Sequence, residues 1–92
     1  MKYALSFYLD PENLGEHCSL EQAYARVRQV LASLKFTCHH GDFYLGDASV
    51  SPVQCVLAAQ KMNALYPWFK SSVRDFKMLR VEDINDMGPA LE

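Results

Sequence analysis

The sequence has no Cys-x-x-Cys pair and only three cysteines, Cys18, Cys38 and Cys55, among its 92 residues. An odd and scattered set argues against a disulfide scaffold and against a zinc site built on paired cysteines. We therefore expect reduced thiols and a cytoplasmic protein. The chain also has no apolar run of about 18 residues, and its apolar opening ends at Asp10 and Glu12, so we expect neither a membrane span nor a signal peptide.

An excess of positive charge is missing as well. Nine Lys and Arg against eleven Asp and Glu give a formal charge of −2, so any contact with a nucleic acid must come from a local basic patch. Half of the residues are hydrophobic and 22% are charged, which is typical of a folded domain. Ninety-two residues suffice for one small domain, which excludes two-domain enzymes and folds with a long parallel sheet.

Hydrophobic periodicity predicts the elements of the first half of the chain. Apolar residues alternate up to Leu9 and predict a strand over 2–9 whose two faces both contact protein. After a loop that runs to Ser19, Ser19 and Gln22 fit a capping box at the start of a helix over 20–34.

Turn and cap signals predict the second half. Two short strands around Gly41, over 36–40 and 43–45, predict a hairpin. Ser51 before Pro52 predicts the N-cap of a helix that ends at Pro67.

Strand character returns over 73–82, where the adjacent Met78 and Leu79 interrupt the alternation and predict a bulge. Residues 83–92 are acidic and contain no base. We expect them to form a solvated tail or an edge segment added to a partner.

The element order βαββαβ is typical of the α+β class and of the ferredoxin-like fold. We predict one ferredoxin-like domain over 1–82, with a four-stranded antiparallel sheet of order 4-1-3-2 and two helices on one face. Since the helices cover only one face of the sheet, we also predict a homodimer.

In this topology the first two strands end where the third and fourth begin. The polar and aromatic residues at that end are Tyr8, Asp10, His39, His40, Asp42, Arg74 and Asp75. Carboxylates there can hold a divalent cation such as magnesium while Lys and Arg hold a phosphodiester. The alternative is that these acids and bases pair with one another and with water.

Histidines and aromatic residues offer two further features. His39 and His40 are adjacent in a strand, so we expect their side chains on opposite faces, where either can act as acid or base in RNA cleavage. Trp68 and Phe69 precede the basic residues Lys70, Arg74, Lys77 and Arg80. Such a patch suits single-stranded nucleic acid, unless the two aromatic side chains pack in the core.

Short motifs extend over nearly the whole chain: Tyr3-Ala4-Leu5 with Phe7, Ala23-Tyr24, Gly41 with Tyr44, Pro67-Trp68-Phe69 and Ser72-Val73-Arg74-Asp75. The sequence thereby resembles the virulence-associated protein D (VapD) family of small bacterial endoribonucleases. The resemblance implies a ferredoxin-like homodimer, similar in fold to the small CRISPR-associated ribonucleases, whose C-terminal segments pack across to the other subunit. It also implies action on RNA and a toxin encoded with an antitoxin protein.

The first strand departs from the family, which has Ala-Phe-Asp-Leu where this chain has Ser6-Phe7-Tyr8-Leu9. Tyr8 thus replaces an acid that the resemblance makes central to cleavage. The hairpin also differs, because Asp42 stands where the family usually has Ser. We hypothesise that Asp42 supplies the lost carboxylate from a neighbouring strand, with Asp10 as a second candidate two residues beyond Tyr8.

Two functions therefore stay open. The first is an RNA endonuclease, with catalytic candidates Asp75, Asp42 and Asp10 and RNA-binding candidates Tyr8, Arg74, Lys77, Arg80 and His40. The second is a catalytically weakened homologue that binds RNA or a protein partner without cleavage, which the loss of the acid favours. The intact Arg74-Asp75 block favours the nuclease.

Overall fold

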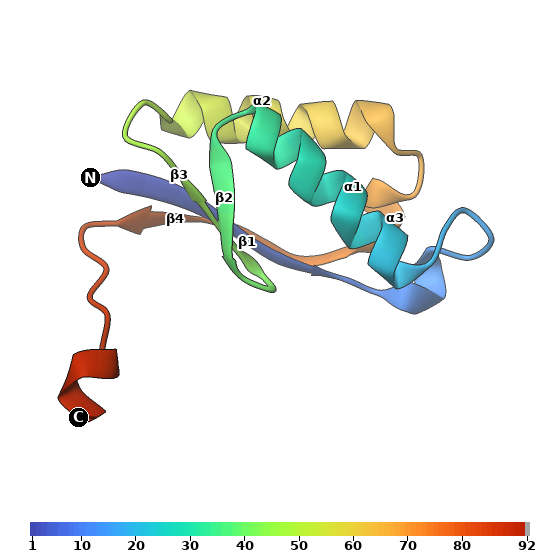
Figure 1. Ribbon diagram of the computed structural model, residues 1–92. Helices are drawn as coiled ribbons and strands as arrows, with labels where there is room; N and C mark the ends of the chain where they lie inside the picture. Colours follow the sequence, from blue (N-terminus) through green and yellow to red (C-terminus); the bar gives the residue numbers. More distant parts are fainter. Residues whose placement is uncertain (92) are drawn as a thin grey trace.

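The computed structural model describes residues 1–91, and in it two long helices lie across one face of a four-stranded sheet (Figure 1). Glu92, the last residue of the predicted tail, lies outside the described residues. The elements in chain order are β1 (Lys2–Leu9), η1 (Pro11–Asn13), α1 (Leu20–Ser33), β2 (Phe36–His40), β3 (Phe43–Gly46), α2 (Pro52–Leu65), α3 (Phe69–Ser72), β4 (Val73–Val81) and η2 (Gly88–Leu91).

The strands lie in the order β2-β3-β1-β4, which confirms the predicted order 4-1-3-2. β1 is antiparallel to both of its neighbours: Ala4 faces Leu45 of β3 on one side and Leu79 of β4 on the other. The ferredoxin-like α+β fold is therefore confirmed. β1 is a central strand, whereas β4 forms one edge of the sheet.

Local sequence explains where the two long helices begin. Ser19 and Gln22 form the predicted capping box of α1, and each residue bonds the backbone N–H of the other. Ser51 and Gln54 form a second capping box at α2, with Pro52 in the first helical position.

Aromatic side chains form the centre of the core between the sheet and the helices. The ring of Phe7 stacks on Tyr44 at 5.0 Å between centroids and meets Phe76 edge-on at 5.2 Å. Trp68 and Phe69 are each only 2% exposed. Of the two alternatives for these aromatic residues, packing in the core is therefore confirmed, and they offer no aromatic surface to a nucleic acid.

Two short helices, η1 in the predicted loop and α3 just before β4, were not predicted. Asp10 caps η1 by accepting a hydrogen bond from the Glu12 N–H, and Pro11 takes the first position. This is the same cap-and-proline pattern that identifies α2. α3 fills four residues between Trp68 and β4, and its Phe69 enters the core.

The predicted bulge at Met78 and Leu79 is wrong. These two residues pair in regular register with Leu5 and Ala4, because each keeps the strand alternation. The irregularity lies nearer the start of β4, between Lys77 and Arg74.

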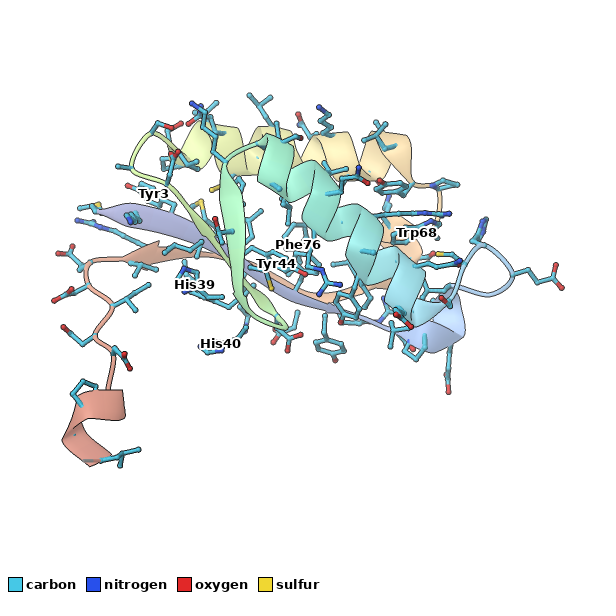
Figure 2. All side chains as sticks on the ribbon, in the orientation of Figure 1. Tyr3, His39, His40, Tyr44, Trp68 and Phe76 are labelled. Carbon is cyan, nitrogen blue, oxygen red and sulfur yellow. The ribbon has the colours of Figure 1, made fainter. Side chains whose placement is uncertain are left out.

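A second register shift lies in β2, between Cys38 and His40. Cys38 pairs with Tyr44 and His40 pairs with Phe43, so His39 is an extra residue on β2. Figure 2 shows both histidines on the side of the sheet away from the helices, and the ring of His39 lies 6.2 Å from that of Phe43. The expectation of opposite faces is therefore wrong, because the extra residue breaks the alternation.

Residues 82–91 are exposed, and η2 lies apart from the sheet (Figure 1). This agrees with a solvated tail, while its packing on a partner stays a prediction. Within residues 1–91, none of the helices combines the length and the apolar character needed to cross a membrane.

Candidate active site

The end of β1 is fixed by contacts from both layers of the fold. Tyr8 pairs with Arg74 of β4, and its side chain is 47% exposed on the face of the sheet that carries no helix. One residue further, the backbone N–H of Leu9 donates to the hydroxyl of Tyr24 on α1 at 2.9 Å. The exposed Tyr8 ring thus stands on a backbone that is held in place from the helix side.

Arg74 bonds both to backbone carbonyls and to a carboxylate. Its Nη1 donates to the carbonyl oxygens of Ser71 at 2.8 Å and Val73 at 2.9 Å. Its Nη2 lies 3.6 Å from Oδ2 of Asp10, and both side chains are partly exposed. A guanidinium has five N–H groups, so Arg74 retains donors for a further anion.

The Asp10 carboxylate is largely occupied by its own loop. Oδ1 accepts from the Glu12 N–H and Oδ2 from Nδ2 of Asn13, each at 3.0 Å. With Arg74 as an additional partner, Asp10 links β1, η1 and the start of β4. This supports a structural role for the second candidate carboxylate.

Asp42 lies opposite Phe7, the neighbour of Tyr8 on β1. Its carbonyl oxygen accepts from the Phe7 N–H at 3.1 Å, which joins the hairpin turn to β1 one residue before Tyr8. Within residues 1–91 the Asp42 carboxylate has no hydrogen bond or ion pair. Of the three predicted carboxylates, this one has both oxygens free.

A second row of candidates crosses the sheet next to Tyr8. His40 pairs with Phe43, Phe43 with Ser6, and Ser6 with Lys77, so the row runs over all four strands. Nζ of Lys77 lies 2.9 Å from Oδ1 of Asp75, and both side chains are well exposed. Such an exposed pair contributes little, so the Lys77 ammonium is not committed to Asp75.

Arg80 is the one RNA-binding candidate that lies elsewhere. It pairs with Tyr3, three positions before Ser6 on β1, and its Nη2 lies 3.2 Å from Oε1 of Glu82. Because β4 alternates regularly here, Arg80 also points to the opposite face from Lys77. The other predicted site residues, by contrast, share the end of the sheet at which β1 finishes.

The predicted divalent cation was placed on Asp10, Asp42 and Asp75. Within residues 1–91 no three His, Cys, Asp or Glu side chains are grouped as they would be around a metal ion. Asp10 and Asp75 each have a basic partner instead. The carboxylates of Asp10, Asp42 and Asp75 are thus not gathered into one group within the described residues.

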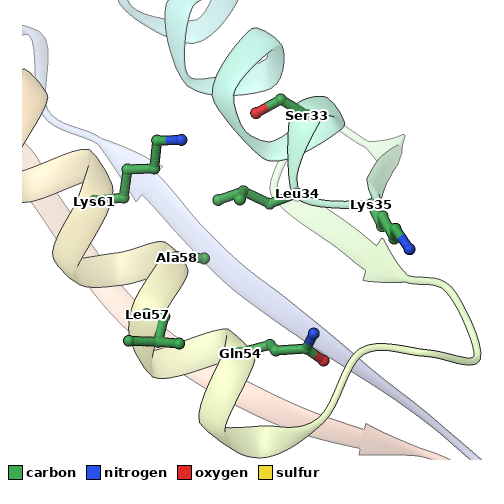
Figure 3. A pocket seen from close by; sticks show the side chains of 7 residues that line it. All are labelled: Ser33, Leu34, Lys35, Gln54, Leu57, Ala58 and Lys61. Atoms are coloured by element: carbon green, nitrogen blue, oxygen red, sulfur yellow. The ribbon is translucent and has the colours of Figure 1, made fainter.

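A hollow of about 310 Å³ lies away from these residues, between the end of α1 and α2 (Figure 3). Leu34 points toward Ala58 across it, and Lys35 and Lys61 stand at its rim. None of the predicted site residues lines this hollow. The candidate active site is thus a surface of the sheet rather than a deep pocket.

Two features near the site were not predicted. The Tyr24 hydroxyl anchors β1 by accepting from the Leu9 N–H. Tyr24 lies at the edge of the helix face that carries the buried Ala23 and Val27, and from there its hydroxyl reaches the sheet. The buried Tyr44 hydroxyl has no hydrogen-bond partner in the described residues. Burial, and secondarily the Cys38 thiol, raises the pKa of Tyr44 above its ordinary value of 10.0.

The strand order and the helices on one face define a small ferredoxin-like protein with a polar site at the end of β1. No family model matches the chain. Among curated proteins it is 37% identical to "Endoribonuclease VapD 2" of Riemerella anatipestifer over 97% of this chain and 98% of that protein. It is 33% identical to "Endoribonuclease VapD homolog" of Helicobacter pylori over 98% of this chain and 96% of that protein.

A further Helicobacter pylori protein, "Endoribonuclease VapD", is 34% identical over 91% of this chain. These similarities extend over nearly the whole length of each protein. The chain belongs to the VapD endoribonuclease family, as its motifs indicated.

Proposed function

We propose that this protein is an RNA endonuclease whose active site is the open face of the sheet where β1 ends. The observation that carries the proposal is the pairing of Tyr8 with Arg74 on this face. The Asp42 carbonyl, which accepts from the Phe7 N–H, joins the hairpin turn to β1 one residue before Tyr8. A base-stacking ring, a free carboxylate and a guanidinium with spare donors are groups that RNA cleavage needs.

The roles follow from the partners of each side chain. Arg74 and Lys77 bind phosphate oxygens, since a guanidinium and an ammonium provide charge-assisted donors. Tyr8 stacks on a base. The Asp42 carboxylate is the proton acceptor, and His40 next to the same hairpin turn binds RNA.

The proposal includes a divalent cation only as an ion that the protein and the RNA would bind together. Magnesium is usually held by one or two carboxylates together with phosphate oxygens, so a single free carboxylate at Asp42 fits that chemistry. Such a cation would neutralise charge that develops on the phosphate.

The experiment that tests this function is cleavage of an unstructured RNA by purified protein, with magnesium and with EDTA. Asp42→Asn and Arg74→Met should each lower kcat/KM by about a hundredfold, the scale of a lost acid-base group. Glu21→Gln, which removes an exposed carboxylate on α1, should cleave like wild type. Equal cleavage by all four proteins would contradict the proposal and indicate a contaminating nuclease.

The same experiment separates cleavage from binding. Tyr8 stands where the family resemblance places an acid, and that observation favours the second candidate, a protein that binds RNA without cutting it. If wild-type protein binds the RNA and Arg74→Met does not, while neither cleaves, the binding function replaces the nuclease.

We further propose a homodimer in which the open faces of two sheets contact each other around Leu79 and Val81, at the end of the sheet away from Tyr8. Apolar side chains that are not buried within the subunit support this, because the pairings put Leu79 and Val81 on the face that the helices leave bare. Light scattering should give twice the monomer mass, and Leu79→Asp should give monomers. Leu57→Asp on exposed α2 is the control and should stay dimeric; a monomeric wild type would contradict the proposal.

We also propose a toxin-type role in the cytoplasm, opposed by an antitoxin protein. The three free cysteines suit a reducing compartment. Induced expression of wild-type protein should then arrest growth, while Asp42→Asn should not. Equal growth of the two strains would contradict the toxin role without touching the cleavage assay.

A further inference from the structure

The register between β1 and β4 changes at one place, opposite Phe7. Ser6 pairs with Lys77 and Tyr8 pairs with Arg74, so two steps along β1 correspond to three steps along β4. One extra residue therefore lies on β4 in this interval, which is the definition of a β-bulge. Asp75 lies inside it with a φ of 53°, in the left-handed region.

This bulge decides which way Arg74 points. In a regular strand, residues three apart point to opposite faces, so Arg74 and Lys77 would be separated by the sheet. With the extra residue, they pair with Tyr8 and Ser6, which lie on the same face of β1. Both cations thus reach the open face, and Arg74 comes within 3.6 Å of Asp10.

The left-handed conformation is selective for residue type. It is open to glycine and is tolerated by Asp and Asn, whereas alanine is penalised and a β-branched residue is strongly disfavoured. Within residues 1–91, in contrast, the Asp75 carboxylate has only the exposed Lys77 as a partner, a kind of ion pair that contributes little.

We propose that Asp75 is a positioning residue: its left-handed backbone, and not its carboxylate, maintains the bulge that places Arg74 beside Tyr8 on the RNA-binding face. This inference rests on the proposed function of Arg74 as a phosphate ligand. It makes the conformation of one residue a requirement for assembling the two cations into a single site.

The test compares four substitutions, all of which remove the carboxylate. Asp75→Gly and Asp75→Asn keep the left-handed conformation accessible and should stay within about threefold of wild type in affinity for a short fluorescent single-stranded RNA and in kcat/KM. Asp75→Ala and Asp75→Val do not, and should each lose about tenfold or more, the scale of the left-handed penalty. Circular dichroism on each variant identifies any that fails to fold. If Asp75→Val does not fold, the conclusion rests on Asp75→Ala.

Substitutions made in the Arg74→Met background show whether Asp75 affects RNA binding and cleavage by positioning Arg74. In that background Asp75→Ala should cause no further loss, because the bulge has no guanidinium left to place. If Asp75→Asn and Asp75→Gly lose as much as Asp75→Ala, or if Asp75→Ala binds and cleaves like wild type, the inference is wrong. Wild-type behaviour of Arg74→Met would instead overturn the phosphate contact in the proposed function.

Discussion

The two faces of β1 have opposite surroundings although they belong to the same eight residues. On the helix side Leu5, Phe7 and Leu9 are at most 3% exposed, and Phe7 contacts aromatic rings from three other elements. On the other side Tyr8 is 47% exposed and stands next to Arg74. Adjacent residues of one strand therefore serve stability and function separately, which makes the two roles open to independent tests.

The largest expected effect is on the core side. Phe7→Ala should lower the free energy of unfolding by about 3 to 5 kcal/mol, because it empties a site surrounded by packed rings. Urea denaturation followed by circular dichroism measures it. Tyr8→Ala is the matched neighbour and should change that free energy by about 0.5 kcal/mol or less. Similar losses from the two changes would show that the faces do not differ as described.

On the open side of β1 we expect a loss of RNA affinity instead of a loss of stability. Tyr8→Ala should weaken binding of single-stranded RNA by about 1 to 3 kcal/mol, the contribution of one stacked base. Tyr8→Phe keeps the ring and should bind like wild type. Fluorescence anisotropy with a labelled RNA measures both. If Tyr8→Phe loses as much affinity as Tyr8→Ala, the hydroxyl and not the stacking surface contacts the RNA.

The smallest expected effect is the change in stability when one buried hydroxyl is removed from the core. Tyr44→Phe removes a buried hydroxyl without a partner in the described residues and should raise stability by about 1 kcal/mol at neutral pH. Burial raises the pKa of Tyr44, so folding resists its ionisation. Wild type should therefore lose stability relative to Tyr44→Phe as the pH rises above about 10, where an unfolded tyrosine ionises. A lower stability of Tyr44→Phe in urea at pH 7 would reveal a partner for the hydroxyl.

Regular features of the fold were predictable because each depends on few neighbouring residues. The alternation in β1, the Ser19-Gln22 capping box and the Ser51-Pro52 pair indicate a strand and the starts of two helices directly, and the handedness of crossovers then leaves few sheet orders. The structure confirms the order of the strands. That order makes β1 and β4 neighbours, whereas the pairing of Tyr8 with Arg74 also needs the shift in register between them.

Irregular features were not predictable from short patterns. The bulge at Asp75 depends on how β4 meets β1 far away in the chain, so the local Met78-Leu79 pair suggested the wrong place. The same holds for the extra residue at His39 in β2. Asp10-Pro11, by contrast, repeats the signal of Ser51-Pro52, and the helix it begins was missed only because η1 is three residues long.

The pairing of Tyr8 with Arg74 also bears on how the protein is made. β1 leaves the ribosome before its partner β4, the last of the strands in residues 1–91, so this central strand lacks one neighbour until β4 has been synthesised. Pairings this distant in sequence form slowly. Because the proposed active site takes groups from both strands, a nascent chain of this protein would be inactive toward the RNA around it until β4 has folded into place.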